Sequence, residues 1–293
     1  LALADDIAYR KAYCNMMLGN TAKALSRFAA LTTSPTYSNA ARFYQGYLYY
    51  TQGEYAEAKR IFDTVDQYSA PGDQTPYYLT QIAFHEGNYD HALSMARRAL
   101  SEHPDSPYTP EMLRIAGESL YHSGETSEAI GYLDRYLSTT DISQAEPSAL
   151  YILGINAYQQ GDLDRAVRLL TPVTAQPDAI GQSAYLYIGQ ASLQQGNMDA
   201  ALMALEKAYR LDYDQSVRET AFYNYAVTRM EGGRVPFGSS VALMEDFLRT
   251  YPNSRFAPQV QEYLVTGYMT DNNYDQALAS INAVKRPTPA IIA

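Results

Sequence analysis

The chain has 293 residues, of which 46% are hydrophobic and 18% charged, a composition typical of an ordered protein rather than a disordered one. Its formal net charge of -10 argues against a nucleic-acid or anionic-membrane partner, since either would favour a basic surface. No apolar run approaches the ~18 residues of a membrane-spanning helix, and the single cysteine, Cys14, excludes an intrachain disulfide.

One short motif recurs along the whole chain. It begins with Gly and reaches Ala after five residues, as in Gly87-Asn88-Tyr89-Asp90-His91-Ala92-Leu93. The turn glycines are spaced 34, 34, 37, 37, 35 and 37 residues apart, and an Asn follows after 39 more. A fixed period of this length indicates stacked helical hairpins. The turn residues are Gly19, Gly53, Gly87, Gly124, Gly161, Gly196, Gly233 and Asn272.

Each glycine is expected to end one helix, because it adopts the left-handed conformation without a Cβ penalty. A small residue seven positions earlier and the Ala five positions later are predicted to mark the place where the two helices of a hairpin touch. The small residues before the turns are Ala12, Gly46, Gly117, Gly154, Gly189 and Ala226, and the departures are Thr80 and Val265.

In chain order, each repeat is predicted to contain a first helix, a short turn, a second helix and a loop. The expected first helices are 5–18, 39–52, 76–86, 110–123, 147–160, 182–195, 219–231 and 257–270. The expected second helices are 20–31, 54–67, 88–101, 125–138, 162–171, 197–210, 237–249 and 273–284. Pro172 is expected to end its helix early, since proline cannot donate a helical hydrogen bond.

This pattern resembles the tetratricopeptide repeat family. The framework residues that carry the resemblance are Gly46, Tyr49, Gly53, Tyr55, Ala58 and Phe62 in one repeat; Gly87, Tyr89, Ala92, Ala99 and Pro104 in another; and Phe222, Tyr225, Ala226, Gly233, Phe237, Phe247 and Pro252 in a later one. The resemblance implies an all-α, right-handed superhelical solenoid of about eight repeats forming a single domain over residues 1–293. The expected repeats are 5–38, 39–72, 73–109, 110–146, 147–181, 182–218, 219–256 and 257–293. Repeat 7 has two extra residues in its turn at Arg234-Val235-Pro236.

Two loops between repeats match one another. His103-Pro104-Asp105-Ser106-Pro107-Tyr108-Thr109-Pro110 and Tyr251-Pro252-Asn253-Ser254-Arg255-Phe256-Ala257-Pro258 share an aromatic residue, Pro, Ser, a second aromatic residue and Pro. They resemble repeats of bacterial cell-envelope proteins, such as outer-membrane assembly lipoproteins and the Tol–Pal coordinator. The bacterial envelope or periplasm is therefore favoured over the cytoplasm, while the alternative is that the motif only makes a stable joint. We also expect the chain to be a segment of a longer protein.

Signals of catalysis are scarce. Phosphate-binding, dinucleotide-binding, HExxH and CxxC motifs are absent, so neither an enzyme nor a cofactor is expected. His85 and His122 occupy equivalent positions in adjacent repeats, and Glu118 lies one helical turn before His122. A metal site there would need further ligands, and solvated polar side chains are the preferred interpretation.

The positive signal is an aromatic surface. In the family, positions 5, 9 and 12 of the first helices line a concave groove, which implies a non-catalytic scaffold that binds a peptide or protein. About half of these side chains are expected to be exposed and the rest to pack between helices. The alternative function is a structural or regulatory subunit of an envelope assembly that acts through its flanks. The predicted groove residues are Tyr9, Tyr13, Phe43, Tyr47, Tyr50, Tyr77, Phe84, Tyr121, Tyr151 and Tyr158.

Overall fold

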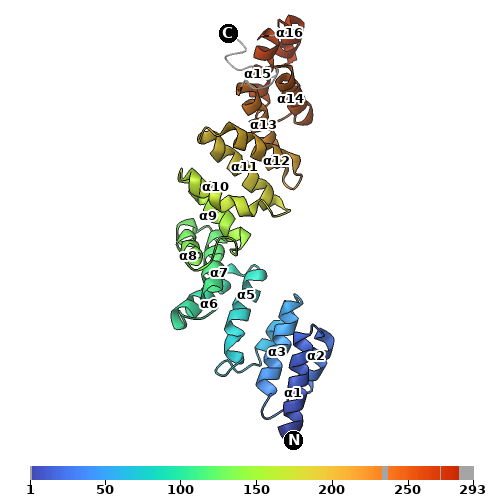
Figure 1. The fold of residues 1–293 in the computed structure, drawn as a ribbon, viewed down its shortest axis with the longest axis vertical. Helices are drawn as coiled ribbons and strands as arrows, with labels where there is room; N and C mark the ends of the chain where they lie inside the picture. Colours follow the sequence, from blue (N-terminus) through green and yellow to red (C-terminus); the bar gives the residue numbers. More distant parts are fainter. Residues whose placement is uncertain (1, 233–236, 271, 284–293) are drawn as a thin grey trace. The chain divides into compact units, whose positions relative to one another are not determined.

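The structure, a computed structural model, describes residues 2–232, 237–270 and 272–283, and every regular element in these ranges is helical. The helices follow one another as hairpins (Figure 1). The first helices are α1 (Ala2–Met17), α3 (Ser38–Thr51), α5 (Thr75–His85), α7 (Thr109–His122), α9 (Pro147–Gln159), α11 (Ala179–Gln194), α13 (Gln215–Glu231) and α15 (Ala257–Thr270). The second helices are α2 (Thr21–Ala29), α4 (Tyr55–Phe62), α6 (Tyr89–Glu102), α8 (Thr126–Thr139), α10 (Leu163–Val173), α12 (Met198–Arg210), α14 (Phe237–Thr250) and α16 (Tyr274–Ala283). A short 3-10 helix, η1 (Gly72–Gln74), precedes α5.

The turn prediction is confirmed for the described glycines. All six have φ between 74° and 86°, and Asn272 takes the eighth place with a φ of 57°. These are left-handed conformations that favour glycine and tolerate asparagine. The predicted insertion Arg234-Val235-Pro236 lies outside the described residues.

Among the second helices, α2 ends two residues before its predicted end, and the ends of α4 and α10 also differ from the prediction. Helix α4 stops at Phe62 instead of residue 67, because α3 intervenes: the Asn39 side chain accepts a hydrogen bond from Asp66 N at 2.7 Å and donates one to Asp66 O at 3.0 Å. This contact holds the chain in a non-helical turn. Helix α10 continues past Pro172 to Val173, so the early end at 171 is wrong. A proline in the last turn removes only one helical hydrogen bond.

The hairpin interior combines a small residue with a large one. A Cβ atom added to Gly117, Gly154 or Gly189 would lie 2.6 Å from the Cγ atom of the leucine found 16 residues later, and one added to Gly46 would lie 2.7 Å from the Phe62 ring. The prediction that both helices lack bulk at the contact is therefore corrected. The small residue makes room for a large side chain of the second helix, while the motif alanines are buried beside it.

Repeat 3 reverses this arrangement. Thr80 stands in the place of the small residue and is 1% exposed, while the residue 16 positions later is Ala96, which is fully buried. In repeats 1, 2, 4, 5 and 6 the corresponding second-helix residues are Phe28, Phe62, Leu133, Leu170 and Leu205. The departure at Thr80 is thus matched by a compensating change across the same hairpin, which keeps the packed volume similar.

The chain divides into two compact units, Leu1–Asp141 and Ile142–Ala293. Within each unit the buried clusters join neighbouring hairpins. One cluster in the first unit contains Ala92 and Ala96 of α6 together with Met112 and Ile115 of α7. The single solenoid expected from the sequence stays a prediction. Among the described residues, we find no helix with the length and apolar character needed to cross a bilayer.

Candidate partner-binding site

Three connections between repeats share one construction. An aromatic ring of the connection stacks on the ring at position 5 of the preceding first helix, with the ring centroids 4.2 to 4.5 Å apart and interplanar angles of at most 18°. The stack holds the connection against the hairpin that it leaves. The pairs are Tyr9–Tyr37, Tyr77–Tyr108 and Tyr223–Phe256.

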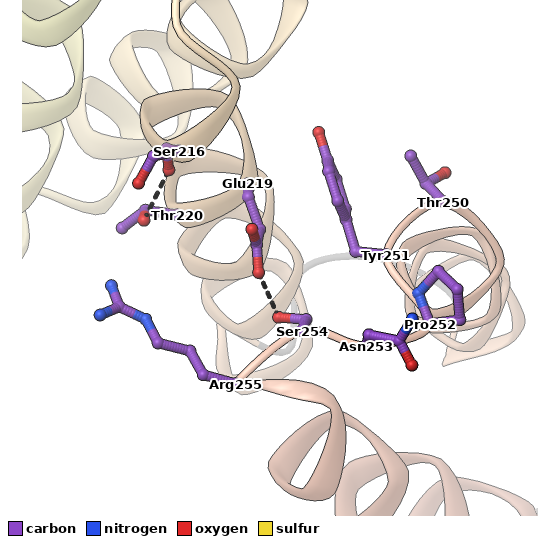
Figure 2. Close-up of a pocket in the computed structure, with 9 residues that line it drawn as sticks. All are labelled: Ser216, Glu219, Thr220, Thr250, Tyr251, Pro252, Asn253, Ser254 and Arg255. Carbon is purple, nitrogen blue, oxygen red and sulfur yellow. Dashed lines mark hydrogen bonds between the residues drawn. The ribbon is translucent and has the colours of Figure 1, made fainter.

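The serine of each connection accepts a hydrogen bond from the backbone N–H of the stacking aromatic residue. Ser254 Oγ accepts a hydrogen bond from Phe256 N at 3.0 Å and donates one to Glu219, beside a cavity of 520 Å³ (Figure 2). Ser34 Oγ likewise donates to Asp5 at 2.7 Å. The matching loops noted in the sequence therefore make a joint between repeats, and the motif has a structural use whatever the compartment.

Of the ten predicted groove residues, two are core residues. Phe43 is 2% exposed and Tyr77 is 7% exposed. Phe43 packs against Phe62 and Tyr78, while Tyr77 is covered by Tyr108. Position 5 is buried because it receives the inter-repeat connection or the next helix, and the expectation that these two rings face a partner is corrected. Tyr9 belongs to the same kind of joint and is half-buried.

Positions 9 and 12 are more accessible. Tyr13 of α1 is 37% exposed, and Tyr47 and Tyr50 of α3 and Phe84 of α5 are half-buried. We call Tyr13, Tyr47, Tyr50 and Phe84 the aromatic row.

Three rings of the aromatic row contact tyrosines that the sequence analysis did not select. Tyr44 contacts Tyr13 with a centroid separation of 5.5 Å, and Tyr78 contacts Tyr47 at 5.6 Å and Tyr50 at 5.2 Å. Tyr44 and Tyr78 both stand at position 6 of their repeats, next to the chosen position 5. Two adjacent aromatic residues, such as Phe43-Tyr44, are the sequence signal from which Tyr44 could have been selected.

The remaining predicted residues are separate from this row. Tyr121 is a half-buried residue near the end of α7. In the second unit, the Tyr151 hydroxyl lies 2.9 Å from Ser183 Oγ, and the Tyr158 hydroxyl accepts a hydrogen bond from Gln194 at 2.9 Å. Both side chains are half-buried and join neighbouring first helices, α9 and α11.

The two histidines considered as metal ligands, His85 and His122, each stack on a tyrosine ring. His85 stacks on Tyr55 with a centroid separation of 5.2 Å, and His122 stacks on Tyr89 at 4.3 Å. Each stack ties the end of a first helix to the start of the preceding second helix. No group of three or more potential metal ligands occurs in the part of the chain that the structure describes.

A buried ionic group lies on α7 next to the aromatic row. The Arg114 guanidinium donates to Glu111 at 2.6 Å and to Glu118 at 2.9 Å, and it lies 5.2 Å from the centre of the Phe84 ring. The side chains of Arg114 and Glu118 are 9% and 4% exposed. This group places a buried cation and two carboxylates beside Phe84.

The tyrosines of this region predict an alkaline transition. Burial raises the pKa of Tyr50 to about 12, and it also raises the pKa values of Tyr44 and Tyr78. Because an unfolded tyrosine loses its proton near pH ~10, the unfolded chain ionises first. The resulting stability is complete below pH ~10 and is lost as the pH rises toward the folded pKa. A titration should therefore show late tyrosinate absorbance together with loss of helical circular dichroism. Ordinary titration of all tyrosines in a fully helical protein would contradict this result.

Comparisons with known proteins agree with the observed helical hairpins. The tetratricopeptide repeat family matches residues 3–71, 80–147 and 151–216. Among solved structures, the C-terminal part of a tetratricopeptide repeat-containing protein from Cytophaga hutchinsonii has a TM-score of 0.56 and 18% identity, covering 86% of this chain and 98% of that one. A tetratricopeptide repeat protein from Parabacteroides merdae has a TM-score of 0.50 and 14% identity, covering 90% of this chain and 99% of that one.

A weaker likeness is to YrrB, described as a tetratricopeptide repeat protein with an unusual peptide-binding site. Its TM-score is 0.48 and its identity 19%, covering 65% of this chain and 95% of that one. No curated protein matches the sequence significantly. Since the family matches cover most of the chain, the protein belongs to the tetratricopeptide repeat family.

Proposed function

We propose that this protein is a non-catalytic scaffold whose first unit binds an extended segment of a partner protein along the aromatic row. The observation that carries the proposal is the accessible part of Tyr13, Tyr47, Tyr50 and Phe84, contributed by three successive first helices. Tyrosine offers apolar area and a hydroxyl group at a low entropy cost, which suits recognition.

Charge narrows the class of partner. The chain carries a formal net charge of -10. A neutral or basic segment would approach this surface faster than an acidic one. The envelope role remains a prediction, since the family assignment bears on the fold and the matching loops have a structural use.

A display library of random dodecapeptides would test the proposal. Tyr13 and Tyr47 are suitable positions, because their hydroxyl groups make no hydrogen bond within the described residues. Tyr13→Ala and Tyr47→Ala should each weaken the binding of selected peptides by roughly thirtyfold, as a truncated aromatic anchor typically does. Fluorescence anisotropy would measure the affinity, and thermal denaturation would check that folding is retained.

Tyr213→Ala is a matched control, since this tyrosine is 50% exposed and belongs to the second unit. Peptides that bind the two groove variants as tightly as the natural protein would show that the aromatic row is packing and not a binding site.

A further inference from the structure

A cavity opens at repeat 3 beside the segment that follows α4. A cavity of 480 Å³ lies between the loop that includes Gln67, Tyr68 and Asp73 and the hairpin of α5 and α6. A smaller cavity of 100 Å³ adjoins it, because Leu79 and Met95 line both. Tyr77, Leu79 and Met95 provide apolar surface in the larger cavity. A volume of this size is in the range of binding sites for small ligands and for partner side chains.

An exposed aromatic ring stands at the rim of this cavity. Tyr68 is 99% exposed, although its backbone is held in place. Asp66 accepts hydrogen bonds from Tyr68 N at 3.0 Å and from Ser69 Oγ at 2.9 Å, while Asn39 Nδ2 donates to Ser69 Oγ at 3.3 Å. A fixed backbone that presents a ring to water gains no folding stability from that ring. It does lower the entropic cost of using the ring as an anchor for a partner.

In two of the three joints a carboxylate accepts a hydrogen bond from the serine of the connection, whereas the equivalent carboxylate of repeat 3 does not. Asp5 and Glu219, each 14 residues before a turn glycine, accept hydrogen bonds from Ser34 and Ser254. The equivalent residue in repeat 3 is Asp73, which has no hydrogen bond or ion pair among the described residues. Asp73 lines the 480 Å³ cavity and also a neighbouring one of 350 Å³ that contains Ser106.

The charges around this opening are mainly negative. Besides Asp73, the lining includes Glu102 and, in a further neighbouring cavity, Asp105. The one cation among the lining residues of the 480 Å³ cavity, Arg98, pairs with Glu102 at 2.9 Å. Asp73 and Asp105 therefore remain as an excess of negative charge beside apolar surface and an exposed ring. Lysine and arginine are the side chains that complement such carboxylates.

From this combination we infer that the 480 Å³ cavity of repeat 3 is a second binding site, separate from the aromatic row. It takes a partner segment in which an apolar side chain adjoins a lysine or arginine. The apolar side chain enters between Leu79 and Met95 and packs beside Tyr68, while the basic group meets Asp73.

The same random dodecapeptide library provides the probe. Peptides would be selected on the natural chain and then sorted by their binding to Tyr68→Ala and to Asp73→Asn, two changes at exposed side chains that should leave folding intact. Peptides of the second site should contain an apolar residue next to Lys or Arg and should lose about tenfold or more in affinity in each variant. Added salt should weaken their binding to the natural chain more than to Asp73→Asn.

Tyr13→Ala and Tyr47→Ala are the matched controls, and they should leave these peptides unaffected. Three outcomes would overturn the second site: no peptide distinguishes the natural chain from the double variant Tyr68→Ala/Asp73→Asn, the sensitive peptides lack basic residues, or their binding depends on Tyr13 and Tyr47 instead. Failure of the aromatic row would leave the Tyr68 and Asp73 dependence intact, so the two proposals can fail separately.

Discussion

Leu133→Ala is expected to lower the free energy of unfolding of the first unit by about 2–5 kcal/mol, because it leaves a cavity in a hairpin core. Leu133 is fully buried, and its Cγ atom would lie 2.6 Å from a Cβ atom placed at Gly117. Gly117→Thr alone should cost about 1–3 kcal/mol through overpacking. Urea denaturation followed by circular dichroism would measure both losses.

The double variant Gly117→Thr/Leu133→Ala is the sharper experiment. It places the Thr80/Ala96 combination of repeat 3 in repeat 4. The decreases in the free energy of unfolding of the two single variants should therefore not be additive. The double variant should be at least ~1 kcal/mol more stable than the sum of the two decreases predicts. Strict additivity would mean that Thr80 and Ala96 do not compensate for one another.

A second large effect is expected at the buried ionic group. Arg114→Met should destabilise the first unit by about 3–5 kcal/mol, because the buried carboxylate of Glu118 then loses its ion pair with Arg114. The Glu118 side chain is only 4% exposed and its partner Arg114 only 9%. Thermal and urea denaturation of the variant would measure the loss.

An exposed ion pair on a neighbouring second helix supplies the control. Arg60 pairs with Glu57, and these side chains are 66% and 39% exposed, so Arg60→Met should leave stability almost unchanged. The double variant Arg114→Met/Glu118→Gln should recover much of the lost stability, since it also removes the buried charge that had paired with Arg114. Equal effects of Arg114→Met and Arg60→Met would show that the buried pair contributes no more than a surface pair.

The repeats could be predicted from the sequence because their signals are local. A glycine with positive φ and the alanines beside it depend on residues within one hairpin, and these positions are confirmed. The end of α4 could not be predicted in this way. It depends on Asn39 at the start of α3, which lies 27 residues before Asp66 and reaches it only when α3 and α4 pack against each other, so no signal near residue 62 marks the end.

The candidate site shows the same division. The groove positions follow from the repeat register, so Tyr13 and Tyr47 could be selected from the sequence. Burial of Phe43 and Tyr77 could not, since it depends on rings that arrive from later segments, Tyr78 and Tyr108. The reach of Arg114 to Glu111 and Glu118 follows helical spacing, but its contact with the Phe84 ring requires the packing of α5 with α7.

The reversed pair Thr80/Ala96 has a consequence for how such a chain can be rearranged. An exchange of α5 alone for a first helix with glycine at this place would leave a void opposite Ala96. The reverse exchange would place a threonine against a leucine. Recombination that preserves stability must therefore exchange a complete hairpin, with the breakpoints in the connections between repeats. Even there, a cut between Tyr77 and Tyr108 separates the two rings of one stack. A duplicated or transplanted repeat 3 would remain stable only when the stacking ring of the following connection moves with it.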